Sequence, residues 1–120
     1  MAATALVCDD AAFVRDLIGD VLEGAGISVV AQVGTAEAAV TAAARFTPDV
    51  ILLDLVLPDR SGLEALDAIL QARPEACVIV CTALGERGVT AEALRRGARE
   101  VVVKPVAPVR VLEAVRRALA

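Results

Sequence analysis

The chain contains no histidine, tryptophan or tyrosine, and only two of its 120 residues are phenylalanine. Without histidine, the Ser/His and Cys/His nucleophile pairs lack their base and are excluded. A structural zinc site is disfavoured, because there is no histidine and the three cysteines form no close pair. Since hydrophobic residues still make up 58% of the chain, its core must be built from Ala, Val, Leu and Ile.

Long apolar segments are also missing. No apolar run approaches the ~18 residues that are needed to cross a bilayer. The first residues, MAATALVCDD, lack the basic start and the long apolar region of a signal peptide. Cys77 and Cys81 lie on one expected strand, roughly 13 Å apart and too far for a disulfide. With Cys8 they make an odd number of thiols, which fits a reducing compartment. We therefore expect a soluble cytoplasmic protein without membrane insertion.

The charge balance is acidic and uneven. A net charge of −4 argues against direct nucleic-acid binding. Residues 1–84 carry 12 acids and 4 bases, whereas residues 85–120 carry 4 acids and 8 bases. The last third could present a basic face to an acidic partner, but ordinary solvated helix faces explain the excess equally well.

Short apolar runs alternate with amphipathic helical patterns along the whole chain. The expected strands are residues 4–8, 28–33, 49–54, 76–82 and 100–103. Helical patterns begin near residues 14, 36, 62, 89 and 108, and Ser61 with Glu64 forms a capping box for the third. This alternation predicts an α/β domain with a parallel sheet and helices on both faces. We find no linker or repeat, so residues 1–120 are expected to form one domain without a visible output domain.

The segment DVILLDLVLPDRSG, residues 49–62, is the centre of the pattern. Val50 to Leu53 are apolar at every position, which is typical of a strand buried on both faces of a parallel sheet. Asp54 ends this run at the carboxyl edge, where open α/β sheets bind their ligands. Taken alone, Asp54 fits equally well as a surface aspartate that caps a loop.

Polar residues end three other expected strands: Asp9 with Asp10, Thr82, and Lys104. Because parallel strands end at one edge, these residues should converge on Asp54. Crowded carboxylates raise one another's pKa, and Mg²⁺ relieves this through oxygen ligands at a site shared with phosphate. With no other activated nucleophile, a carboxylate is the natural phosphoryl acceptor. A threonine hydroxyl and a lysine ammonium suit phosphoryl oxygens.

Four motifs together resemble a response-regulator receiver domain of the CheY type, from two-component signalling, over the whole chain. They are the acidic pair in VCDDAAFVR, the acceptor motif DLVLPDRSG, the Thr82–Ala83 pair and the Lys104–Pro105 pair. DDAAFVR is especially similar to stand-alone chemotaxis regulators and to methylesterase receivers. The resemblance implies a flavodoxin-like, doubly wound (βα)5 three-layer sandwich with strand order 2-1-3-4-5.

The resemblance also implies the roles of the site residues. Asp54 would accept a phosphoryl group from a histidine kinase or a phosphotransfer protein, and phosphorylation would switch the binding of a downstream protein. The implied Mg²⁺ ligands are Asp10, Asp54 and the backbone carbonyl of Val56, with Asp9 acting through water. The implied contacts of the phosphoryl oxygens are Thr82 and Lys104. Such a domain is not an enzyme beyond self-catalysed phosphotransfer and slow autodephosphorylation.

Three positions depart from the family pattern. Val56 and Leu84 stand where many relatives have polar residues, and we expect them to slow hydrolysis by covering the path of water. Val101 stands where relatives usually place the aromatic residue that rotates on activation. The signal is then expected to pass through the Gly85–Gly88 loop and the fourth helix. A downstream partner or a second copy would bind the face of the fourth helix, fifth strand and fifth helix.

Three alternatives compete with a phosphorylated receiver. One is an interaction scaffold with a receiver fold that phosphorylation does not regulate. A phosphohydrolase of the haloacid-dehalogenase group would need its nucleophile on the first strand and an Asp where this chain has Val56. A flavodoxin-like flavin protein would need a phosphate-cradling loop after the first strand, where Asp9 and Asp10 would repel phosphate.

Overall fold

The computed structural model describes residues 2–83, 87–105 and 107–120, and in it strands and helices alternate. The elements are β1 (Thr4–Cys8), α1 (Ala12–Gly24), β2 (Ser28–Val33), α2 (Ala36–Phe46), β3 (Val50–Asp54), α3 (Gly62–Ala72), β4 (Val78–Thr82), α4 (Arg87–Arg95), β5 (Glu100–Val103) and α5 (Pro108–Leu119). All strand pairs are parallel, in the order β2-β1-β3-β4-β5. The predicted three-layer fold and strand order are therefore confirmed.

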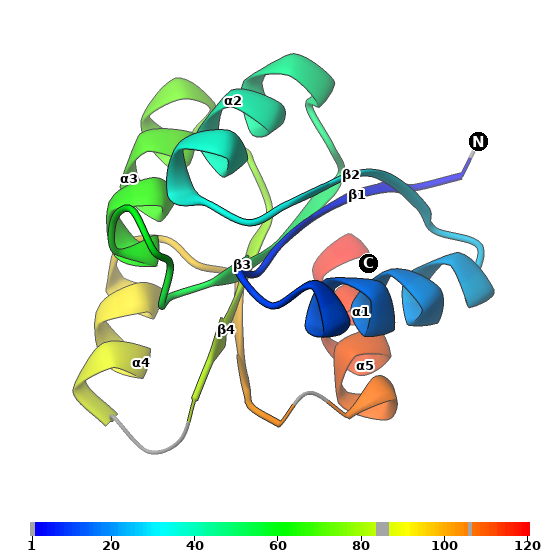
Figure 1. Ribbon diagram of the computed structural model, residues 1–120. Helices are drawn as coiled ribbons and strands as arrows, with labels where there is room; N and C mark the ends of the chain where they lie inside the picture. The colour runs from blue at the N-terminus through cyan, green and yellow to red at the C-terminus, as the bar shows by residue number, and fades with distance from the viewer. Residues whose placement is uncertain (1, 84–86, 106) are drawn as a thin grey trace.

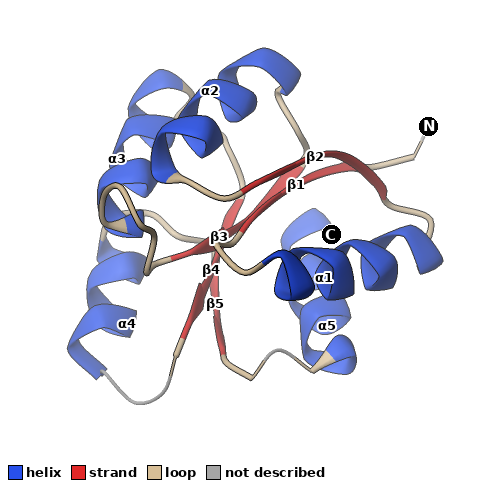
Figure 2. Cartoon of the chain, viewed as in Figure 1, coloured by secondary structure: helices blue, strands red, loops and turns tan. Residues whose placement is uncertain are grey.

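The sheet is a middle layer between two layers of helices (Figure 2). Helices α2, α3 and α4 cover one face, and α1 and α5 cover the other (Figure 1). Every residue of β3 is buried. Because side chains alternate along a strand, Ile51 and Leu53 pack on the first face while Val50 and Leu52 pack on the second.

Small aliphatic residues fill both halves of the core, as the composition requires. The two phenylalanines contribute little, since Phe13 is 78% exposed and Phe46 is 39% exposed. The three cysteines are buried and unbonded to one another, as predicted. Among the described residues, no helix has the length and apolar character that a bilayer crossing requires.

Several helix starts follow the sequence signals. Thr35 caps α2, since its hydroxyl accepts a hydrogen bond from the Ala38 N–H at 3.1 Å. Ser61 caps α3 through the Leu63 N–H at 3.1 Å. The predicted capping box is only half formed, because among the described residues no hydrogen bond joins the Glu64 side chain to the Ser61 N–H. Pro108 begins α5, where its missing N–H costs nothing.

Some predicted boundaries were wrong by one or two residues. The ladder between β3 and β4 begins with the pair Ile51 and Val78, so Cys77 precedes its strand although its carbonyl still accepts the Ile51 N–H at 2.9 Å. Helix α4 begins at Arg87 rather than Val89 and ends at Arg95. Ala25 is the C-cap of α1 and is exposed.

Candidate functional site

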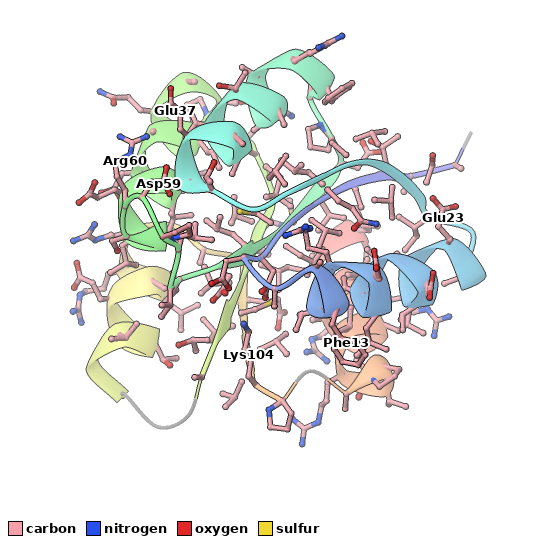
Figure 3. All side chains as sticks on the ribbon, in the orientation of Figure 1. Phe13, Glu23, Glu37, Asp59, Arg60 and Lys104 are labelled. Atoms are coloured by element: carbon pink, nitrogen blue, oxygen red, sulfur yellow. The ribbon has the colours of Figure 1, made fainter. Side chains whose placement is uncertain are left out.

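The carboxyl edge of the sheet brings four of the predicted site residues together. One carboxylate oxygen from each of Asp9, Asp10 and Asp54 lies within 4.8 Å of the other two. Lys104 reaches these acids from the end of β5 (Figure 3). Its Nζ lies 2.8 Å from Asp9 Oδ2 and 3.0 Å from Asp54 Oδ2. A single ammonium is therefore shared by two carboxylates at the ends of different strands.

Two of the three acids are buried and held by their own loops. Asp9 is 1% exposed and Asp54 is 3% exposed, whereas Asp10 is exposed. Asp9 Oδ1 accepts the Ala11 N–H at 2.9 Å, and Asp54 Oδ1 accepts the Val56 N–H at 3.2 Å. With one oxygen on a backbone N–H and the other on Lys104, each buried carboxylate is fixed in orientation.

The pKa directions show that the charges are incompletely balanced. Burial raises the pKa of Asp54, although hydrogen bonds from the Val56 N–H and Lys104 oppose this effect. Burial lowers the pKa of Lys104, but hydrogen bonds to Asp9 and Asp54 outweigh it, so that the net shift is upward. The two carboxylates thus stabilise the charged form of Lys104. The ammonium that Asp54 shares with Asp9 does not fully offset the cost of burying the Asp54 carboxylate.

The donor set fits a divalent metal ion. Asp9, Asp10 and Asp54 offer only carboxylate oxygens, the ligands that hard divalent cations prefer. Exposed Asp10 leaves one side of the cluster open to solvent, as a small ion that keeps several waters requires. These three residues can therefore hold a metal ion.

Thr82 lies at the neighbouring strand end, but its hydroxyl is engaged elsewhere. Its side chain is buried, and its Oγ1 donates a hydrogen bond to the Ala83 carbonyl at 3.2 Å. A cavity of about 250 Å³ lies beside it, lined by Leu55, Val56, Ser61, Leu63, Thr82, Ala83 and Val89. The structure thus places Thr82 near the acids with its hydroxyl bonded to its own backbone.

The loop between β3 and α3 folds back onto the end of β3. The Gly62 N–H donates to the Leu55 carbonyl at 2.8 Å, and Val56 and Ser61 form an isolated antiparallel bridge. A Cβ atom on Gly62 would lie 2.3 Å from the Asp54 carbonyl oxygen and 2.5 Å from Leu55 Cα. Only glycine allows this close approach.

Two of the three positions that depart from the family pattern, Val56 and Val101, lie in the described part of the structure, and they differ in burial. Val56 is 70% exposed at the rim of the site. Val101 is half-buried and packs against the core under α2, α3 and α4. Leu84 and Gly85 lie outside the described residues.

Two residues near the site were missed by the sequence analysis. Arg15 Nη1 donates to the Asp9 carbonyl oxygen at 2.7 Å, in a space that Gly34 leaves open. Asp59 accepts hydrogen bonds from the first two N–H groups of α2. Two sequence features could have identified these residues. Arg15 lies in the DDAAFVR motif, and Asp59 lies in a Pro-Asp turn.

The comparisons with known proteins agree with this geometry. The family model described as "Response regulator receiver domain" matches residues 5–116, so the chain belongs to the response regulator receiver family. It is 34% identical to the chemotaxis protein CheY of Thermotoga maritima over 98% of both chains. It is 37% identical to CheY of Bacillus subtilis over 99% of both chains.

A solved structure of a related domain has the same fold. The response regulator domain of Thermotoga maritima CheB superposes with a TM-score of 0.91 at 33% identity, over 99% of this chain and 97% of that one. The resemblance inferred from the motifs is thus confirmed. The chain is a signalling domain of this family and not an ordinary enzyme, which contradicts the phosphohydrolase and flavin alternatives.

We expect Asp54→Asn to raise the free energy of unfolding near neutral pH. Because the pKa of Asp54 is raised in the folded state, stability is lost as the pH rises through the aspartate range, and the amide removes this penalty. The gain should be of the usual size for a single substitution, about 1 kcal/mol. Chemical denaturation without added metal measures it, with Asp16→Asn on the exposed face of α1 as control. A less stable Asp54→Asn protein would contradict the charge imbalance.

We expect Gly62→Ala to lower the free energy of unfolding by more than about 2 kcal/mol, because the new Cβ must displace backbone atoms. Gly24→Ala is the matched control, since nothing lies within 4 Å of a Cβ at that helical position. That change should leave stability unchanged or slightly higher. Equal behaviour of the two variants in thermal or chemical unfolding would show that the loop tolerates a side chain.

Proposed function

We propose that residues 1–120 form the receiver domain of a chemotaxis-type two-component phosphorelay in the cytoplasm, with Asp54 as the phosphoacceptor. The observation that carries this proposal is the position of Lys104 Nζ, 3.0 Å from Asp54 Oδ2 and 2.8 Å from Asp9 Oδ2. A buried acceptor carboxylate, held between a second acid and a cation, is suited to receive a phosphoryl group. The similarity to CheY proteins over nearly the whole chain supports the chemotaxis type.

Mg²⁺ is the proposed cofactor. Asp10, Asp54 and the Val56 carbonyl would bind it directly, and Asp9 would act through water. The ion supplies positive charge that offsets the phosphoryl oxygens during transfer. The cluster of three carboxylates and the incomplete compensation of Asp54 by Lys104 support this assignment.

The proposed reaction is transfer from a phosphohistidine of a histidine kinase or a phosphotransfer protein. An Asp54 carboxylate oxygen attacks phosphorus, and the new P–O bond forms while the P–N bond breaks. The electron pair of that bond stays on the imidazole, which is protonated from solvent. Lys104 keeps its positive charge beside the acceptor oxygen. Thr82 then exchanges the Ala83 carbonyl for a phosphoryl oxygen, which moves the end of β4.

The donor must approach the carboxyl edge, and exposed apolar side chains surround it. Phe13 projects from the first turn of α1 (Figure 3). Val56 on the β3–α3 loop and Val109 in the first turn of α5 are 70% and 68% exposed. These three residues would form an apolar rim against which the donor protein packs.

The face formed by α4, β5 and α5 is the proposed surface for a downstream protein or a second copy. Three arginines near this face already have partners within the chain. Arg96 pairs with Asp67 and Glu92, Arg95 pairs with Glu92, and Arg99 donates to the Ala118 carbonyl. Arg110 lines a hollow of about 340 Å³ along β5 and is the better candidate to meet an acidic group.

An unphosphorylated interaction scaffold is the second candidate. The observation that favours it is Val101, which packs into the core where relatives usually have a rotating ring. Valine is short and stiff at χ1, so it cannot move between an exposed and a buried position as a ring does.

Incubation with a small acyl phosphate and Mg²⁺, followed by intact-mass measurement, separates the two candidates. We expect the wild type to gain one phosphoryl group, Asp54→Asn to gain none and Lys104→Ala to react more slowly. Asp16→Asn is the control and should react like the wild type. A full mass shift in Asp54→Asn would exclude Asp54 as the acceptor. An unmodified wild type would support the scaffold.

We expect Val56→Asn to shorten the lifetime of the phosphorylated protein several-fold. Valine cannot orient an attacking water by hydrogen bonding, whereas an amide can, and water positioning is a large part of this step. The control is Val109→Asn, an equally exposed position on α5. Loss of the added mass after removal of the donor gives both lifetimes. An unchanged lifetime for Val56→Asn would refute the shielding role of Val56.

A further inference from the structure

The loop that follows the acceptor is tied to a distant helix by Asp59. Asp59 Oδ1 accepts the Ala36 N–H at 2.8 Å, and Oδ2 accepts the Glu37 N–H at 3.0 Å. Figure 3 shows Asp59 next to the first turn of α2. The first N–H groups of a helix have no partner within that helix. Asp59 therefore supplies from another loop what an N-cap residue normally supplies.

This contact joins two segments, the β3–α3 loop and the start of α2, and each segment is connected to a different part of the acid cluster. On one side, the Val56–Ser61 bridge and the Gly62–Leu55 hydrogen bond close the loop at its base, with Asp59 at its tip. Val56, at that base, also donates its N–H to Asp54.

The other end of the contact is fixed to the acid pair. The Val33 carbonyl, just before α2, accepts the Asp9 N–H at 3.1 Å. The Thr35 carbonyl lies 3.5 Å from Cys8 Sγ, which donates to it. The start of α2 is thus attached to the end of β1, and Asp59 attaches the acceptor loop to the start of α2.

The electrostatics favour an ionised Asp59 in this contact. Hydrogen bonds from the Ala36 and Glu37 N–H groups lower the pKa of Asp59. The carboxylate also faces the positive end of the α2 dipole. Asp59 is not one of the three clustered carboxylates, so its charge serves the contact with α2.

We propose that Asp59 is a positioning residue for the metal site. By holding the β3–α3 loop against α2, it sets the spacing between Asp54 and Val56 on one side and the Asp9–Asp10 turn on the other. The inference rests on the Mg²⁺ site proposed above. Coupling is reciprocal, so metal binding in turn protects the start of α2. Helix α2 lies outside the face formed by α4, β5 and α5. Metal binding would therefore affect a second part of the protein surface, at the start of α2.

Mg²⁺ titration of the full chain, followed by calorimetry or amide chemical shifts, tests the proposal. The variants are Asp59→Ala and a matched control, Thr35→Ala. Both remove an acceptor from the N-terminus of α2, but Thr35 caps Ala38 and does not hold the loop. Asp59→Ala should weaken Mg²⁺ binding by about tenfold, as loss of a residue that orients metal ligands does. Thr35→Ala should bind Mg²⁺ as the wild type does.

Amide hydrogen exchange gives a second readout that does not depend on phosphorylation. In the metal-free protein, the Ala36 and Glu37 amides should exchange faster in Asp59→Ala than in the wild type. Added Mg²⁺ should slow both amides in the wild type and in Thr35→Ala. If Asp59→Ala does not fold, Asp59→Asn replaces it, since its single amide oxygen keeps one of the two hydrogen bonds and should give an intermediate affinity.

Three results would overturn the proposal, and they can be told apart. If the wild type binds Mg²⁺ and Asp59→Ala binds it equally tightly, the positioning role alone is refuted. The same conclusion follows if Thr35→Ala weakens binding as much as Asp59→Ala, because helix capping then explains both effects. If the wild type does not bind Mg²⁺, the metal site of the proposed function fails, and the role of Asp59 fails with it.

Discussion

The sharing of one ammonium between two buried carboxylates is the interaction on which the site depends. Lys104 holds Asp9 and Asp54 from the opposite end of the chain, so that the ends of β1, β3 and β5 are joined by charge as well as by backbone. One positive charge between two acids leaves a negative excess that burial makes expensive. This negative excess is what would favour a further cation at the three carboxylates.

The burial of the sheet explains why the chemistry lies at its edge. Strands covered on both faces have no lateral surface for polar groups, so these are confined to the strand ends. The same packing limits how the domain can move. A core of Ala, Val, Leu and Ile has no large ring whose rotation could carry a signal, and Val101 is a half-buried residue that packs against that core. The movements left to carry a signal are shifts of loops and helix ends. Thr82 and Asp59 make their hydrogen bonds in these parts of the chain.

Much of the architecture could be predicted because its signals are local. The unbroken apolar run before Asp54 indicated a central strand, and the alternation with helical patterns indicated a parallel sheet. The strand order could not be predicted from such local signals, because alternation of strands and helices alone does not determine it. It was predicted from the resemblance to receiver domains. The convergence of Asp9, Asp10, Asp54 and Lys104 followed from topology, since parallel strands end at one edge.

The missed features depend on contacts between elements. The hydrogen bonds of Asp59 join residues more than twenty positions apart, and no periodicity encodes them. The direction of the Thr82 hydroxyl and the pairing of Arg96 with Asp67 are choices among nearby partners, which only the packed structure decides. The start of β4 was misplaced because the neighbouring strand, and not the apolar run, determines the first ladder pair.

The buried thiols give the site chemical selectivity. Cys8 and Cys81 lie on the strands either side of β3, opposite Leu53 and Asp54 in the strand register. Burial raises the pKa of both Cys8 and Cys81 to about 12, and nearby Asp54 adds to this effect. Because a raised pKa keeps these sulfurs protonated at neutral pH, and thiolates are the reactive form, both thiols are expected to be poor nucleophiles and slow targets of peroxide. In the proposed function, the edge that carries Asp54 would respond to a phosphoryl donor with little interference from these thiols.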